Sequence, residues 1–209
     1  SWWQRLISEE RRDGGRDPFA EKYLNERLCV VSPNNISIGS WSDRPLFVWL
    51  DRDKAIQRVE VYDADIEEPI WDDDVGEGTE DGWYVMELPN LTLEPGKTYH
   101  FALRLAGEEG HANAADRAKF GVYSAEDAAP VSAALEAAGL TGYEANLETL
   151  RFFADQSGNR NLKEPIYFLD FARILFSMPA SAERSTYINE IVNTYCKPQS
   201  EELPNIPLG

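Results

Sequence analysis

Residues 93–105 read Leu-Glu-Pro-Gly-Lys-Thr-Tyr-His-Phe-Ala-Leu-Arg-Leu, and this stretch decides the fold that the sequence predicts. Four apolar side chains alternate along its second half, namely Tyr99, Phe101, Leu103 and Leu105. Successive side chains of a strand point to opposite faces, so this alternation predicts a strand over 98–105 with one buried face.

A turn leads into this strand at Pro95-Gly96, because both residue types interrupt regular structure. The pattern Leu-x-Pro-Gly-x-x-Tyr-x-Phe resembles the entry to strand F of immunoglobulin-like and fibronectin-like sandwiches. In those sandwiches a tyrosine hydroxyl ties the corner back to the backbone. The resemblance implies that Tyr99 is such a structural corner.

Seven further β-prone runs lie between turn signals, at 28–32, 36–41, 45–50, 57–62, 69–71, 83–88 and 118–123. Short strands at this spacing are typical of an antiparallel β-sandwich. The predicted core between its two sheets is Phe47, Trp49, Val59, Val61, Trp71, Tyr84, Met86, Tyr99, Phe101 and Leu103. The alternative use of these aromatics is an exposed platform for sugar binding.

After Ser124 the apolar spacing becomes helical. An alanine-rich helix is predicted over 125–139, a second from Tyr143 to a stop at 157–159, and a third between Pro165 and Pro179. Ser181 is a good N-cap for a fourth. Four antiparallel helices with short connections predict a small helical bundle.

The expected organisation is an extended charged arm over 1–26, a sandwich over 27–124, a bundle over 125–197 and an extended tail over 198–209. Gly14-Gly15 breaks any helix in the arm. Its one apolar cluster is Trp2, Trp3, Leu6 and Ile7. We expect this cluster to dock on a partner or on the protein's own surface.

The charge balance limits the partners. The chain has 209 residues with 20 Lys and Arg against 37 Asp and Glu, a net charge of −17. Such a surplus repels phosphate backbones and anionic lipids, so nucleic acid is not an expected partner. No stretch approaches the roughly 18 consecutive apolar residues of a membrane span.

The two cysteines, Cys29 and Cys196, allow a single intrachain pairing. A disulfide would pin the end of the helical part to the first strand and place the protein outside the reducing cytosol. The alternative is two buried free thiols in a cytosolic protein. A cleaved signal peptide would explain the start at Ser1, as would the boundary of a fragment.

The most acidic stretch runs from Asp65 to Asp81 without a Lys or Arg. Its calcium-ligand candidates are Asp72, Asp74, Glu77, Glu80 and Asp81. Calcium takes six to eight oxygen ligands from flexible loops, although the spacing of an EF-hand is absent here. The preferred interpretation is a solvated hairpin loop whose charge keeps an edge strand from pairing with neighbours.

No catalytic pattern emerges from the sequence. A nucleophilic triad needs a histidine, and His100 and His111 lack a matching serine or cysteine context. The paired spacings of a zinc site and the glycine loop of a phosphate site are also absent. We therefore expect no enzyme and no cofactor, with calcium as the one candidate ligand.

Four segments together resemble an uncharacterised family common in cyanobacteria: 28–33, 41–49 with its Trp-Ser-Asp-Arg-Pro-Leu-Phe run, 58–61 and 93–99. The resemblance implies a secreted leader, an immunoglobulin-like N-terminal half and a helical C-terminal half. It also implies that Cys196 closes a disulfide, since a cysteine ends the helical part in similar sequences. The charged arm and the acidic insertion at 72–81 depart from the family.

The expected function is a non-enzymatic exported binding or scaffold module within a larger protein assembly. The expected location is the periplasm, the thylakoid lumen or the cell surface. One alternative is a calcium-dependent adhesion or carbohydrate-binding module that uses the acidic loop over 65–81. Another is an envelope hydrolase, which requires a buried, pKa-shifted carboxylate in a cleft.

Overall fold

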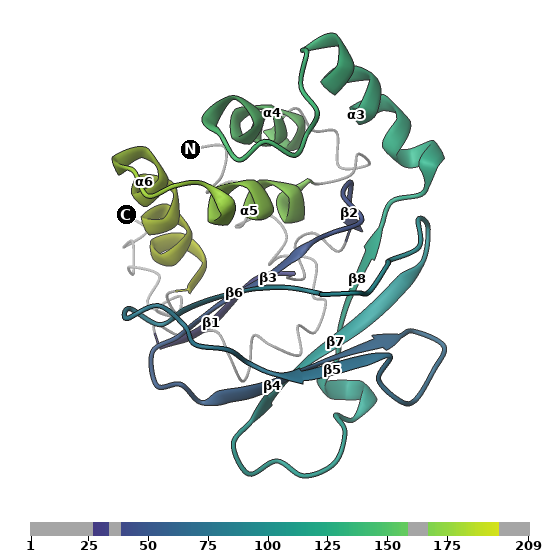
Figure 1. Ribbon diagram of the computed structural model, residues 1–209, viewed down its shortest axis with the longest axis vertical. Coiled ribbons are helices and arrows are strands. Elements are labelled where there is room, and N and C mark those ends of the chain that lie inside the picture. Colours follow the sequence, from purple (N-terminus) through teal and green to yellow (C-terminus); the bar gives the residue numbers. More distant parts are fainter. Residues whose placement is uncertain (1–26, 34–38, 159–166, 197–209) are drawn as a thin grey trace, which may run out of the picture.

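The computed structural model describes residues 27–33, 39–158 and 167–196, which form two sheets and a layer of helices (Figure 1). This mixed content confirms the predicted α+β class. Within these ranges the strands are β1 (Leu28–Ser32), β2 (Gly39–Ser40), β3 (Leu46–Asp51), β4 (Ile56–Asp63), β5 (Trp71–Asp74), β6 (Trp83–Glu87), β7 (Thr98–Leu105) and β8 (Ala118–Val122). The helices are α3 (Ala125–Ala137), α4 (Leu147–Gly158), α5 (Phe168–Ser177) and α6 (Ala182–Ile191), with short helical turns η1 (Ala114–Asp116) and η2 (Val192–Cys196).

The strands divide into a three-stranded sheet, β1-β3-β6, and a five-stranded sheet, β2-β8-β7-β4-β5. All paired strands are antiparallel except β2 and β8, which run parallel. This order leaves β1 and β6 at the edges of the first sheet and β2 and β5 at the edges of the second.

An aromatic core joins the two sheets. The ring of Phe47 on β3 lies 5.2 Å from that of Phe101 on β7 and 5.3 Å from that of Phe120 on β8, centroid to centroid. All three side chains are buried. Full burial of one such side chain stabilises a fold by about 1.5–3 kcal/mol, so these contacts hold the sheets face to face.

The turn before β7 is tied to the strand by Tyr99. Its hydroxyl accepts a hydrogen bond of 2.9 Å from the backbone N–H of Glu94. The ring is buried and stacks near Phe120, with centroids 5.7 Å apart. This bond fixes the direction in which the chain enters β7.

The central strand β3 has no exposed face. Its residues Phe47 and Trp49 belong to the core between the sheets, whereas Leu46, Val48 and Leu50 belong to a second core beneath the helices. A strand covered on both faces is apolar throughout instead of alternating. That is why this part of the sequence is a continuous apolar run.

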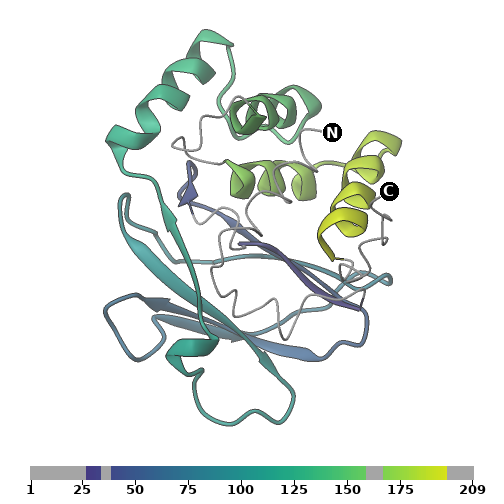
Figure 2. The ribbon, with the colours of Figure 1, turned by 180° about the vertical axis from the view of Figure 1, so that it is seen from behind.

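The helices form a third layer on the three-stranded sheet (Figure 1), and Figure 2 shows the same layering from behind. The buried helix α5 packs on β1, β2 and β3 and is flanked by α4 and α6. The predicted bundle therefore has no core of its own in the described residues, because its apolar surface is shared with the sheet. The division of the chain into a sandwich over 27–124 and a bundle over 125–197 stays a prediction.

Two helix starts show what the sequence predicted well and what it missed. Ser181 caps α6 as expected, because its Oγ accepts a hydrogen bond of 3.1 Å from the N–H of Arg184. The second helix was predicted to begin at Tyr143, but α4 begins at Leu147. Asn146 caps it by accepting a 2.9 Å bond from the N–H of Thr149, and Tyr143 lies exposed before the cap.

The turn after β2 is anchored by Asp170 of α5. The two carboxylate oxygens of Asp170 accept hydrogen bonds from the N–H groups of Trp41 at 2.7 Å and Ser42 at 3.1 Å. Arg173 lies 3.3 Å from the same carboxylate and donates a 2.8 Å bond to the carbonyl of Gly142. The Trp-Ser-Asp-Arg-Pro run is thus the joint between the second sheet and the helices.

Substitution of Gly142 by alanine is expected to destabilise the protein more than the same change at Gly139. Both residues have positive φ, +86° and +70°, which costs a β-carbon about 1–2 kcal/mol. A β-carbon at Gly142 would also lie 2.7 Å from the ring of Trp41, whereas one at Gly139 meets no atom within 4 Å. Overpacking adds about 1–3 kcal/mol, so chemical denaturation should rank G142A well below G139A. Equal losses would contradict this account of the joint.

Candidate functional site

The described sheets have four edge strands, β1, β2, β5 and β6, which differ in how readily they could accept a further strand. The turn η2 contacts β1, and the disulfide between Cys29 and Cys196 joins the two. Strand β2 has only two residues. The edge of β5 is protected by charge, as described next, and β6 is the remaining edge. Unpaired edges attract other strands, so a single open edge is a candidate binding site.

Part of the acidic run, Trp71–Asp74, forms a strand where the sequence predicted a loop, whereas residues 75–81 lie outside any strand. Asp72, Asp73 and Asp74 occupy β5 and pair with β4 along its outer side. Asp72 is held by Arg58 at 2.6 Å. The prediction failed here because aspartate is rare in strands, and the cross-strand partner that tolerates it lies 14 residues earlier. The charged edge still repels neighbouring strands.

The calcium candidates are not brought together. Asp72 and Asp74 share one face of β5, but Asp72 is already paired with Arg58. Thr79 donates a hydrogen bond of 2.5 Å to Asp81 within its own turn. In the described part of the chain, no three Asp, Glu, His or Cys side chains are grouped so that they could hold a metal ion.

The open edge of β6 can be located from its hydrogen bonds. Both backbone groups of Trp83 point away from β3, because its carbonyl accepts a 2.9 Å bond from Thr79 N and its N–H donates a 3.0 Å bond to Thr79 Oγ1. In an antiparallel pair this direction alternates along the strand. The N–H and C=O groups of Val85 and Glu87 therefore point outward as well, and no described residue pairs with them.

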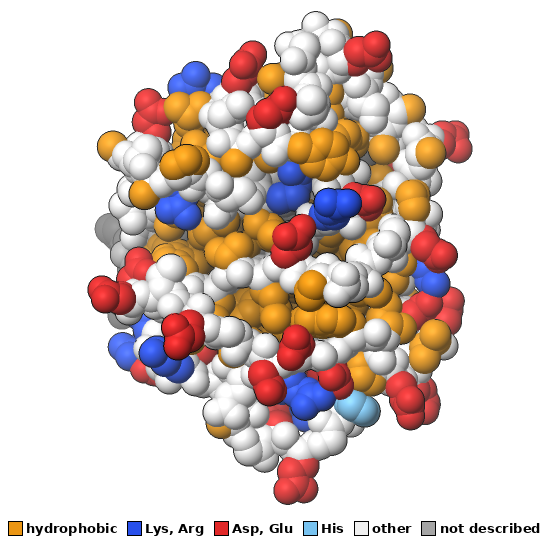
Figure 3. All heavy atoms as spheres, in the orientation of Figure 1, with side chains coloured by type: hydrophobic (Ala, Val, Ile, Leu, Met, Phe, Trp, Pro, Cys, Tyr) orange, Lys and Arg blue, Asp and Glu red, His pale blue; other side chains and the backbone are white. Residues whose placement is uncertain are grey.

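The open edge also exposes an apolar side chain. Val85 is 46% exposed, one of the largest exposures among the apolar residues described. Trp83, on the same side of the strand, is partly buried against Phe176 of α5, with ring centroids 5.1 Å apart. Figure 3 shows hydrophobic atoms gathered on this face, along the course of β6 between the helices and β5.

The surroundings of the open edge are acidic. Residues 65–87 hold ten carboxylate side chains and no Lys or Arg. Among the described residues only Asp72 of these ten makes an ion pair. Two exposed arginines flank this edge: Arg44 lies two positions before Leu46, which pairs with Glu87, and Arg52 lies beside Gly82 at the start of β6. The segment that leads into β6 is nevertheless strongly negative.

Buried carboxylates exist, but each one holds backbone amides. Asp51 accepts hydrogen bonds from the N–H groups of Ala55 at 3.0 Å and Ile56 at 2.8 Å. Burial raises the pKa of Asp170, opposed by the positive charge of Arg173 and by its two backbone donors. Neither carboxylate lines the pocket described below. An acid or base in catalysis must face its substrate, so these two groups are structural.

Glu60 of β4 anchors the loop that follows β7. Its carboxylate is fully buried, lies 2.6 Å from Nδ1 of His111, and accepts a 3.2 Å hydrogen bond from the N–H of Ala112. Arg104 lies 3.3 Å from the same carboxylate. No described hydroxyl or thiol hydrogen-bonds to His111, so the pair lacks the nucleophile of a triad.

Two further groups surround this anchor. Burial, followed by the neighbouring Glu60 carboxylate, raises the pKa of Tyr62 to about 12. The guanidinium of Arg117 lies 3.6 Å from the centre of the Tyr62 ring and donates to the carbonyl of Ala112 at 2.9 Å. The cluster therefore closes the loop onto the sheet, with the side chain of His111 48% exposed at its rim.

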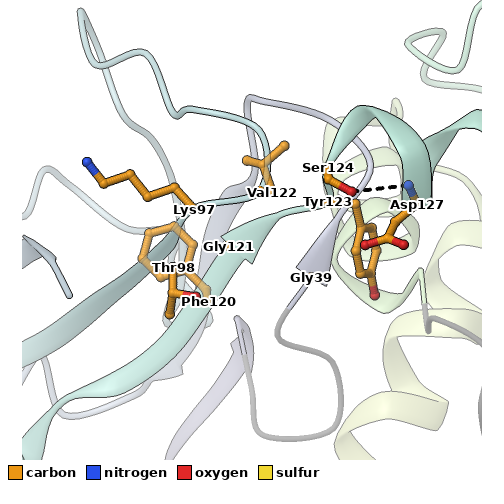
Figure 4. Close-up of a pocket in the computed structure, with 10 residues that line it drawn as sticks. Gly39, Lys97, Thr98, Phe120, Gly121, Val122, Tyr123, Ser124 and Asp127 are labelled. Carbon is orange, nitrogen blue, oxygen red and sulfur yellow. Dashed lines mark hydrogen bonds between the residues drawn. The ribbon is translucent and has the colours of Figure 1, made fainter. Parts of the chain in front are cut away.

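A pocket of about 190 Å³ lies where β8 leads into α3 (Figure 4). Its walls include Gly39, Gly121 and the N-cap residue Ser124, whose hydroxyl accepts a 3.2 Å bond from the N–H of Asp127. Lys97 also lines it, but its amine lies 2.5 Å from Asp63 and 3.3 Å from Glu94. The pocket thus combines glycine backbone and the side chains of Phe120 and Tyr123 with a lysine that is already paired.

The predicted contact residues Trp2, Trp3, Leu6 and Ile7 lie outside the described residues. Sequence reasoning did not single out Val85, although a signal was present. In the predicted strand over 83–88, Tyr84 and Met86 supply the core face, so an apolar Val85 on the opposite face has no partner in a plain sandwich.

The chain matches no protein-family model and no curated protein. No helix in the described residues combines the length and the apolar character that crossing a membrane requires.

Proposed function

We propose that this protein is a non-enzymatic binding module whose contact surface is the open edge of β6. The carrying observation is the contrast between edges. Strand β1 is joined to η2 by the disulfide, β2 has two residues and β5 is charged, whereas β6 points the backbone groups of Val85 and Glu87 outward. Recognition by strand addition uses such backbone groups for affinity and neighbouring side chains for specificity. A binding module of this kind requires no catalytic group.

The proposal includes an immunoglobulin-like sandwich as the scaffold. Support comes from the strand order, since β1-β3-β6 and β8-β7-β4 correspond to the A-B-E and G-F-C sheets of such folds. The Tyr99 hydroxyl bond adds to this support. We also propose an extracytoplasmic location, because disulfides persist mainly in oxidising compartments.

Replacement of Val85 by proline is expected to abolish partner capture, while replacement by threonine should leave it intact. Proline removes the outward N–H but no hydrogen bond to β3, so the strand itself should persist. Threonine keeps both the backbone donor and the β-branched shape. Wild type and both variants would be used as bait with the envelope fraction of the source organism, and the captured proteins compared by mass spectrometry.

Circular dichroism and thermal melting would first confirm that the proline variant is folded. A partner captured equally by all three proteins would show that contact is made elsewhere. Elution of the wild type alone, as a monomer, would remove the main support for a binding module.

A further inference from the structure

We infer that the segment added to β6 is an extended, basic stretch of a protein partner that alternates apolar and Lys or Arg side chains. This inference rests on the proposed function and names the partner's chemistry. Val85 and Glu87 present two N–H and two C=O groups outward, and an incoming strand can pair with them.

The apolar part of the partner follows from the exposed side chain of Val85. A strand laid beside β6 places every second side chain on the same face as Val85 and Trp83. Those positions contact a surface that already continues into the helical layer through Phe176. Apolar side chains at alternate positions would therefore bury Val85.

The basic part follows from charge complementarity. Nine of the ten carboxylates over 65–87 make no ion pair among the described residues. Glu87 shares the face of Val85, so basic side chains on the opposite face of an incoming strand would be attracted to the acidic segment that precedes β6. Attraction between surface charges extends over about a Debye length, about 10 Å at 0.1 M salt. Complementary charge also raises the rate of encounter.

A second copy of this chain is disfavoured as the occupant. Pairing β6 with β6 across a twofold axis would place two Glu87 side chains and two acidic stretches together. Each chain carries a net charge of −17, so the copies repel. A basic partner would instead be attracted to this negatively charged chain.

Two labelled peptides of about eight residues test the inference, one alternating valine with lysine and one alternating valine with glutamate. Their binding to the full chain would be followed by fluorescence anisotropy, with V85P and V85T as the matched variants. The lysine peptide should bind wild type and V85T at least about tenfold more tightly than V85P. Wild type should also bind the lysine peptide about tenfold or more tightly than the glutamate peptide. This difference in affinity should shrink near 1 M salt, where the Debye length is about 3 Å.

Each of the other outcomes contradicts a specific part of the inference. Equal binding of the two peptides to wild type, lost in V85P, removes the basic partner but leaves the open edge as the site. Lysine-peptide binding that V85P does not reduce shows attraction to the acidic surface alone and removes strand addition as well. Binding that appears only after deletion of residues 1–26 makes the chain's own arm the occupant, and a peptide-independent dimer in sedimentation makes it a second copy. Either result overturns the inference.

Discussion

Asp170→Ala is expected to lower the free energy of unfolding by about 3–5 kcal/mol, because it removes one partner of a buried pair. The change leaves the N–H groups of Trp41 and Ser42 without their acceptor and leaves the buried Arg173 without its counter-charge. The loss would be measured by urea denaturation followed through tryptophan fluorescence. A decrease below about 1 kcal/mol would show that the joint does not depend on this carboxylate.

A double-mutant cycle makes this test specific. The variant carrying Asp170→Leu with Arg173→Met should be more stable than the sum of the single losses predicts, since an apolar pair leaves no buried charge. Additive losses would indicate that the two side chains act separately.

Asp170 also gives the stability a defined pH dependence. Burial raises the pKa of its carboxyl in the folded state above the ordinary value of 3.8, so the folded protein holds this proton more tightly than the unfolded chain. The stability of wild type relative to Asp170→Asn should therefore be greatest at acid pH and should fall as the pH rises through the raised pKa. Denaturation of both proteins from about pH 4 to 8 measures this difference.

Loss of the disulfide is expected to cost up to about 5 kcal/mol, the chain-entropy value for so long a loop. Cys29 and Cys196 are 167 residues apart in sequence, and both side chains are fully buried. The melting temperature should fall in the presence of a reductant once the bond is reduced. The Cys29→Ala, Cys196→Ala double variant should melt near the reduced wild type and show no response to the reductant.

Thiol alkylation before and after reduction provides the direct check. Wild type should take up no alkylating groups under native or denaturing conditions without reductant, and two after reduction. Two alkylated thiols in the unreduced protein would contradict the bond and, with it, the main support for an extracytoplasmic location.

The local patterns predicted most of the sheet architecture. Alternation over Thr98–Leu105 matches β7, and Leu28–Ser32 matches β1, because each strand buries alternate or all of its side chains. Turn residues mark the ends of these strands, and their effect is local, so the strand ends could be predicted without knowledge of distant contacts. Ser181 was recognisable as a cap for the same reason, since the acceptor and donor of the cap lie within one turn.

What the sequence did not reveal depends on contacts between distant residues. The acidic strand β5 is stabilised by pairing with β4, which outweighs the low strand propensity of aspartate. The joint between the second sheet and the helices depends on Asp170 and Trp41, which are 129 residues apart. A helical stripe shows that a face is buried but not which surface covers it. The edge position of β6 depends on the strand order, which pairs β6 with β3 alone among the described strands.

The double burial of β3 restricts how this protein can change. A substitution at Phe47 or Trp49 disturbs one core, and a substitution at Val48 or Leu50 disturbs the other, through the same stretch of backbone. The two cores therefore constrain each other's sequence at β3. A substitution on one face of the strand that shifts its backbone must be compensated on the other face. Sequence variation should concentrate instead on surfaces such as α3, where few positions are buried.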